Sequence, residues 1–134
     1  MIDHEAELFT TIATALRTQF PDIYVSGEYV SQPPKFPAVY IIQQDNTVNR
    51  LGRDSGAIEN FADVMYQVDI YSNLNKGKKA EAKAIAAAID GEFASLGFTR
   101  SYLNPVPNMD DATIYRITGR WIATIGKDNY IYRR

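Results

Sequence analysis

Two adjacent carboxylates, Asp110 and Asp111, are the first residues in this sequence of 134 whose types would allow chemistry. Paired carboxylates act as general acid and base, or hold a metal ion, when they face a common site. This pair follows Pro107 and Asn108, however, and aspartates in such turns usually bind backbone groups. We therefore interpret the pair as a turn feature without a catalytic role.

A third carboxylate, Asp69, lies in the middle of a segment that alternates apolar and polar residues. On a half-buried strand a carboxylate must be paired, solvated or at an interface, because burying an unpaired charge is costly. Arg116 and Arg120 lie in the other long alternating segment and are the expected partners. Simple exposure of Asp69 to solvent is the alternative, and the sequence leaves it open.

Other residue patterns for catalysis are missing from the sequence. The chain has no cysteine and a single histidine, His4, which we interpret as a solvated residue at the start of a helix. It contains no glycine-rich phosphate loop and no GxSxG or HExxH motif. We therefore expect a protein that is not an enzyme, with no catalytic residue, cofactor, metal ion or small-molecule substrate. An enzyme of unrecognised type, using Asp69, Asp110 and Asp111, is the least favoured alternative.

Two groups of basic residues are candidates for contact with another molecule. The first surrounds the start of an expected helix and consists of Lys76, Lys78, Lys79 and Lys83. It is either a solvated face or a surface that meets an acidic neighbour. The second lies at the C-terminus and combines aromatic with basic residues, namely Lys127, Tyr130, Tyr132, Arg133 and Arg134. These types are enriched at interfaces, and a net charge of −2 with a pI near 5.3 favours protein over nucleic acid as the partner.

The composition is that of an ordinary globular protein. Hydrophobic residues make up 46% of the chain and charged residues 22%, and the length suits one domain over residues 1–134. Every apolar run is shorter than the roughly 18 residues that a membrane span requires. The N-terminus has no secretory pattern, so we expect a soluble protein of the cytoplasm.

Apolar periodicity predicts the elements that must position these residues. Helices are expected from Asp3, which can cap the first one, to Phe20 and from Lys78 to Leu96, because apolar residues recur there at spacings of three and four. Strands are expected where residues alternate or form short apolar runs, at 23–25 with 29–30, Ala38 to Gln44, Phe61 to Ser72, Phe98 to Leu103 and Ala112 to Ile125. Turn-forming residues predict a long hairpin loop from Asp45 to Asn60, which contains Arg50 and Arg53, and a turn from Asn104 to Asp111.

This order predicts an α+β fold, a mainly antiparallel sheet with two helices packed on one face and a long loop between central strands. A ferredoxin-like arrangement is the main competitor. The segment from Ala38 to Gln44 is apolar on both faces at its start. We therefore expect it to be covered on both sides, by helices or by a neighbouring subunit.

Several stretches of the chain resemble small proteins encoded in phage head-to-tail gene clusters. They are FPAVYI at 36–41, NFADVMYQVDIYSN at 60–73, LGFTR at 96–100, NPVPN at 104–108, YR at 115–116 and IYRR at 131–134. In these stretches the chain is similar to the tail terminator, or tail completion, proteins of long-tailed non-contractile phages and prophages, sometimes labelled minor capsid proteins.

This resemblance implies a structural protein that forms a ring, hexameric in that family. The ring caps the tail tube, ends its polymerisation and offers a joining surface to the head completion or connector protein, at the head-tail junction of the virion after assembly in the host cytoplasm. The partners are then further copies of the chain, the major tail tube protein and the connector, with DNA only passing through the lumen.

A ring subunit needs one patch that contacts a different patch on the next copy. We place these contacts on the loop from Asp45 to Asn60 and on the exposed face of the sheet. The candidate interface residues are Arg50, Arg53, Asp69, Arg116, Arg120, Tyr130, Tyr132, Arg133 and Arg134. The alternative is a small sheet-based nucleic-acid-binding module that uses the aromatic residues with Arg116, Arg120, Arg133 and Arg134.

Overall fold

The computed structural model of the chain describes residues 1–29, 32–49, 61–107, 111–128 and 130–133, the last of them in its backbone alone. Its elements in chain order are α1 (Glu5–Gln19), β1 (Tyr24–Ser26), β2 (Ala38–Val48), β3 (Phe61–Ser72), α2 (Lys78–Ser95), β4 (Thr99–Val106), β5 (Tyr115–Gly126) and β6 (Ile131–Arg133). The expected α+β class and the mainly antiparallel sheet are confirmed. No helix in these described ranges is long and apolar enough to cross a membrane.

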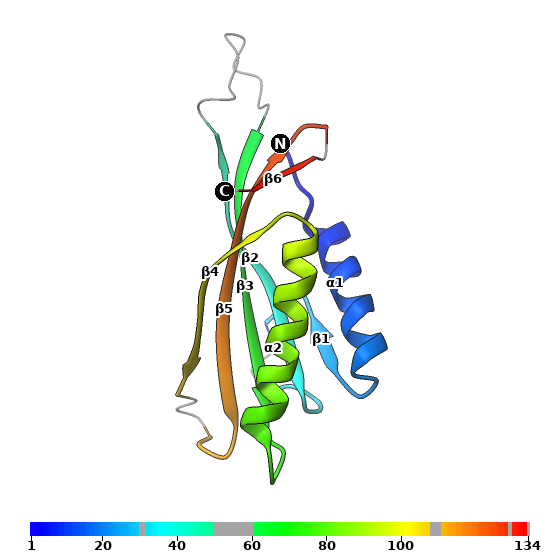
Figure 1. Ribbon diagram of the computed structural model, residues 1–134, viewed down its shortest axis with the longest axis vertical. Coiled ribbons are helices and arrows are strands. Elements are labelled where there is room, and N and C mark those ends of the chain that lie inside the picture. Colours follow the sequence, from blue (N-terminus) through cyan, green and yellow to red (C-terminus); the bar gives the residue numbers. More distant parts are fainter. Residues whose placement is uncertain (30–31, 50–60, 108–110, 129, 134) are drawn as a thin grey trace.

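The strands form one sheet in the order β1-β2-β3-β5-β4 (Figure 1). β1 pairs with β2 in parallel, and the other pairs are antiparallel. β3 runs along one edge of β5, from Ser72 opposite Tyr115 to Phe61 opposite Gly126. β4 and β6 follow each other along the rest of β5, and the small β1 forms the opposite edge of the sheet.

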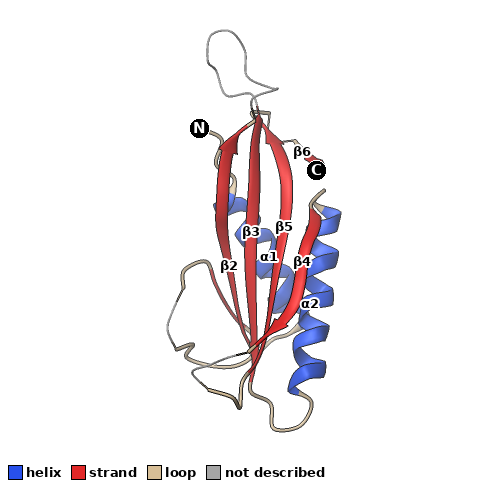
Figure 2. Cartoon of the chain, turned by 90° about the vertical axis from the view of Figure 1, so that its left-hand side faces the viewer, coloured by secondary structure: helices blue, strands red, loops and turns tan. Residues whose placement is uncertain are grey.

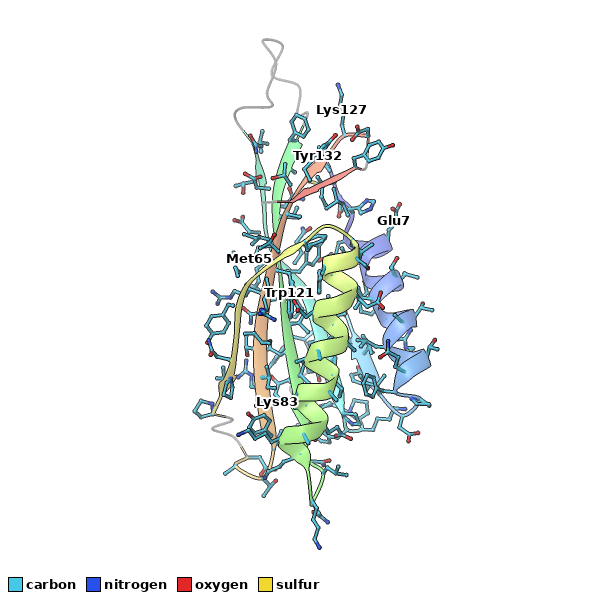
Figure 3. The ribbon with its side chains drawn as sticks, viewed as in Figure 1. Glu7, Met65, Lys83, Trp121, Lys127 and Tyr132 are labelled. Atoms are coloured by element: carbon cyan, nitrogen blue, oxygen red, sulfur yellow. The ribbon has the colours of Figure 1, made fainter. Side chains whose placement is uncertain are left out.

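Both helices of the described chain lie on the same face of the sheet, as the sequence predicted (Figure 2). Their apolar stripes bury one side of β2, β3 and β5 in a single core. Trp121 of β5 is fully buried there, and Figure 3 shows it between β5 and α2. Its ring stacks on Phe93 of α2 with centroids 4.8 Å apart, and its Nε1–H donates to Asp90 Oδ1 at 3.0 Å. Sheet and helix are thus joined by both packing and a hydrogen bond.

Local signals set the ends of the helices. His4, not the expected Asp3, takes the cap position of α1, and its side chain makes no capping hydrogen bond. Asp3 lies one residue before the cap, where it accepts a hydrogen bond from the backbone N–H of Glu5 at 3.2 Å. α2 ends before Gly97, the predicted stop, whose φ of 97° is a left-handed conformation that favours glycine.

Two strands extend further than the sequence predicted. β2 continues through Asp45 to Val48, where a loop was expected, because it stays paired with β3 across a register shift after Gln43. β4 continues through Asn104 and Pro105, where a turn was expected. Proline is tolerated there because β4 lies at the edge of the sheet, where the missing N–H costs no ladder bond. The remainder of the predicted loop, 50–60, lies outside the described residues.

The predicted cover for the second face of β2 was wrong. Tyr40 points away from the helices and is only 1% exposed. The chain's own segment between β1 and β2 covers it, since the ring of Tyr29, a residue that is not part of a strand, lies 5.4 Å from the Tyr40 ring. Phe36 packs against the same small cluster. Neither a helix nor a neighbouring subunit is needed at this end of the sheet.

The buried tyrosines make the fold sensitive to alkaline pH. Burial, and then the charges of Glu5 and Asp3, raise the pKa of Tyr66 above its ordinary value of 10.0. The unfolded chain loses this proton near pH ~10 while the folded chain keeps it, so the stability from Tyr66 is fully present below pH ~10 and is lost as the pH rises further. Circular dichroism across this range should show a smaller alkaline loss of stability in Tyr66→Phe. Tyr130→Phe, at a 69% exposed residue, should behave like the wild type.

Candidate functional site

The face of the sheet opposite the helices is here called the open face, and it is turned toward the viewer in Figure 2. It carries most of the polar side chains of the long strands. Alternation along each strand sends every second residue to this face. On β3 these are Asp63, Met65, Gln67, Asp69 and Tyr71, and on β5 they are Arg116, Thr118, Arg120, Ile122 and Thr124. The cross-strand register decides which of them meet.

Asp69 is the centre of the interactions on the open face. Its Oδ1 accepts hydrogen bonds from Arg116 Nη2 at 2.9 Å, from Arg116 Nε at 3.2 Å and from Thr118 Oγ1 at 2.6 Å. The side chain of Asp69 is 6% exposed and that of Arg116 is 25% exposed. The predicted pair of Asp69 and Arg116 is therefore present, and it is a largely buried ion pair; solvation of Asp69, the alternative, is wrong.

Arg120, the other expected partner of Asp69, reaches it through a glutamine. Its Nε donates to Gln67 Oε1 at 3.1 Å, and Gln67 Nε2 donates to Asp69 Oδ2 at 3.3 Å. The register explains this, because Gln67 lies directly opposite Arg120 whereas Asp69 lies opposite Thr118. Both arginines thus join one network, but only Arg116 touches the carboxylate.

Aromatic rings close both ends of this network. The Arg116 guanidinium lies 5.5 Å from the ring centre of Tyr71, and that of Arg120 lies 5.6 Å from the ring centre of Tyr102 on β4. The ring face attracts the guanidinium at such distances. The set Tyr71, Arg116, Thr118, Asp69, Gln67, Arg120 and Tyr102 is called the open-face network below.

Burial and charge also set the protonation of the network. Burial, followed by the charge of Asp69, raises the pKa of the Tyr71 hydroxyl above its ordinary value. For Arg116, burial acts to lower the pKa, but hydrogen bonding to Asp69 and its charge outweigh burial and raise it. Tyr71 therefore stays neutral and Arg116 stays charged at neutral pH. The network is a fixed arrangement of charges and donors, whose carboxylate is already occupied by neighbouring groups.

The remaining candidates for chemistry occupy structural positions. Asp111 accepts hydrogen bonds from the backbone N–H of Thr113 at 2.9 Å and from its hydroxyl at 2.6 Å, and these bonds lower the pKa of Asp111. It is the turn residue that the sequence predicted, while Asp110 lies outside the described residues. His4 is less solvated than expected, with a side chain 14% exposed and Nε2 at 3.3 Å from Glu7 Oε2. In the described ranges no group of three or more His, Asp or Glu side chains is placed to hold a metal ion.

The predicted interface residues at the C-terminus lie far from the open-face network along the sheet. Tyr132 of β6 packs edge-to-face on Phe61 at the start of β3, with ring centroids 5.6 Å apart, whereas Tyr71 lies near the end of β3. Tyr130 and Tyr132 are 69% and 45% exposed. The side chain of Arg133 and all of Arg50, Arg53 and Arg134 lie outside the described residues.

Sequence reasoning missed the parts of the network that carry no charge. Gln67, Thr118 and Tyr102 link or end the chain of contacts, yet each is an ordinary strand residue in the sequence. The alternation along the strand could have indicated part of the network, because it places Gln67, Asp69 and Tyr71 on one face. Their partners on the next strand depend on the register.

Comparison with known proteins shows which family the chain resembles. A family model described as "Tail completion protein gp17" matches residues 7–100 of the chain. No curated protein matches the sequence. Among solved structures, a chain from "Virion of native gene transfer agent (GTA) particle" is 16% identical, with 88% of each chain covered and a TM-score of 0.54. At that identity the likeness concerns the fold.

Proposed function

This chain belongs to the tail completion protein gp17 family, and on that premise we propose that it caps the end of a phage tail tube as a ring of identical subunits. The family confirms the resemblance found in the sequence and gives the chain a structural role in phage tail assembly. Beyond that role, the proposed ring ends tube polymerisation and offers a joining surface to the head connector. The protein then acts without catalysis, at the head-tail junction of the virion, after assembly in the host cytoplasm.

The open-face network is the observation that carries this proposal. It holds Arg116, Arg120 and Tyr102 on a face of the sheet that no helix of the described chain covers, with the buried Tyr71 supporting Arg116 from below. Arginine and tyrosine are enriched where proteins meet. Because hydrogen bonds to Asp69 and Gln67 hold the two arginines in place, little conformational entropy is lost when a partner binds them.

The mechanism follows from occupation of a surface. A tube grows when each new layer of subunits binds the exposed end of the previous one. A ring that binds the same end removes that surface from the next layer, so growth stops without any chemical step. The ring's other face is then free to contact the connector, which is how one small protein performs both tasks.

Tube length in a purified system tests this proposal. We expect the major tail tube protein to form tubes whose mean length falls as the chain is added before polymerisation, and electron microscopy should show the chain at a tube end. Unchanged tube lengths at a molar excess of the chain would contradict the capping function. A heat-unfolded sample of the chain is the control for nonspecific effects.

Binding to nucleic acid separates this proposal from the alternative module. Asp69 neutralises the charge of Arg116, and the hydrogen bond to Gln67 occupies Arg120 Nε without changing its charge, so one of the two positive charges on the open face is already balanced. We expect no retention of single-stranded DNA at low salt. Tight binding that weakens steeply with added salt would favour the nucleic-acid module.

A further inference from the structure

A groove of ≈ 520 Å³ lies between α2 and β4, at the edge of the sheet opposite β1. Its apolar lining includes Leu103 of β4 and Tyr115 and Ile117 of β5. Two residues of α2, Lys79 and Lys83, line the groove as well, and Figure 3 shows Lys83 on the side of the helix next to β5. The groove therefore combines an apolar floor with basic side chains along one wall.

The charges of this groove are unbalanced. Its carboxylate, Asp90, is already paired with Arg100 at 3.1 Å and accepts the Trp121 indole N–H. Lys79 and Lys83 are exposed, and within the described ranges neither takes part in an ion pair. Two positive charges are thus left beside an apolar surface, which suits an occupant that carries carboxylates.

Carboxylates of this kind lie at the opposite edge of the same molecule. Asp22 and Glu28 are exposed and flank β1. The register puts them at the end of the sheet where α2 begins, since β1 pairs with the start of β2 and Ala38 of β2 faces Tyr71 near the end of β3. Figure 1 shows the end of α1 and the start of α2 at this same end.

We propose that the groove between α2 and β4 receives the β1 edge of a second copy of this chain, with Asp22 and Glu28 placed against Lys79 and Lys83. This inference rests on the proposed ring and names its contact surfaces. The groove and the β1 edge are two different patches on opposite edges of the sheet, and both lie at the end where α2 begins. Each copy can therefore bind the next in one direction, which is the kind of contact that closes a ring. Complementary charge sets the orientation, and the apolar floor adds buried surface.

Charge reversal on each side tests this contact by native mass spectrometry of the full chain. We expect Lys79→Glu with Lys83→Glu, or Asp22→Lys with Glu28→Lys, to weaken subunit association by about a hundredfold or more, since facing like charges disfavours association. All four substitutions together restore opposite charges and should restore the ring. Glu7→Lys and Lys127→Glu change charges in the half of the molecule away from Lys83 (Figure 3) and should leave the ring intact.

The outcomes separate this inference from the function on which it rests. A wild-type ring that survives Lys79→Glu with Lys83→Glu, in protein with unchanged circular dichroism, would overturn the proposed contact and leave the ring standing. Failure of the fourfold variant to reassemble, when each double variant dissociates, would overturn the pairing of these two edges. A wild-type chain that forms no ring, even with tail tubes present, would defeat both proposals.

Discussion

Replacing Trp121 by alanine is expected to cost about 3–5 kcal/mol of stability, the usual cost of truncating a fully buried large aromatic residue. Trp121 is 0% exposed and stacks on Phe93 with an interplanar angle of 7°. The substitution removes the largest side chain that β5 packs against α2, and the paired strand holds its backbone away from the space that is left. Because small domains have only about 5–15 kcal/mol in total, urea denaturation should show a much lower midpoint.

Trp121→Phe is the matched control for this prediction. Phenylalanine keeps an aromatic ring against Phe93 but loses the indole N–H that donates to Asp90. Asp90 keeps its bond to Arg100 at 3.1 Å, so we expect a clearly smaller loss than for Trp121→Ala. Equal losses in the two variants would mean that the hydrogen bond, and not the packing, dominates the contribution of Trp121.

Replacing Asp69 by alanine should have the second largest effect, a loss of about 2–4 kcal/mol, because it leaves a buried partner without its counter-charge. Arg116 is only 25% exposed on its side chain, and the Thr118 hydroxyl, in a residue 6% exposed, loses its acceptor. The full cost of a broken buried pair is discounted here since the guanidinium keeps some contact with water. Urea denaturation of the purified variant measures the loss.

A double substitution separates the missing pair from the missing volume. Asp69→Leu with Arg116→Leu removes both charges, so it should be less destabilising than Asp69→Ala. Arg100→Ala breaks the more exposed pair with Asp90, where Arg100 is 48% exposed, and should cost less than about 1 kcal/mol. A double variant as unstable as Asp69→Ala would show that the charges are not the source of the effect.

The elements predicted well from the sequence are those with a strong local period. α1, α2 and β3 begin and end within two residues of the predicted bounds, because the spacing of their apolar residues and the residues that end them are properties of the local chain. The pairing of Asp69 with Arg116 was also predicted, from the cost of burying an unpaired charge. A carboxylate inside an apolar strand needs a partner, and few basic residues were available.

The features that were missed depend on segments far apart in the sequence. The link from Arg120 to Gln67 depends on the register of β3 against β5, which a one-residue shift would change. Continuation of β2 to Val48 depends on pairing with β3 across an irregular step. The cover of Tyr40 by Tyr29 depends on the path of a connection that has no period of its own.

Native mass spectrometry of the wild-type chain, alone and mixed with short tubes of the major tail tube protein, tests the central claim most directly. The account predicts a closed ring of identical subunits, six by resemblance to tail terminator proteins, that binds the end of a tube. A chain that stays monomeric at every concentration and does not associate with tubes would contradict it.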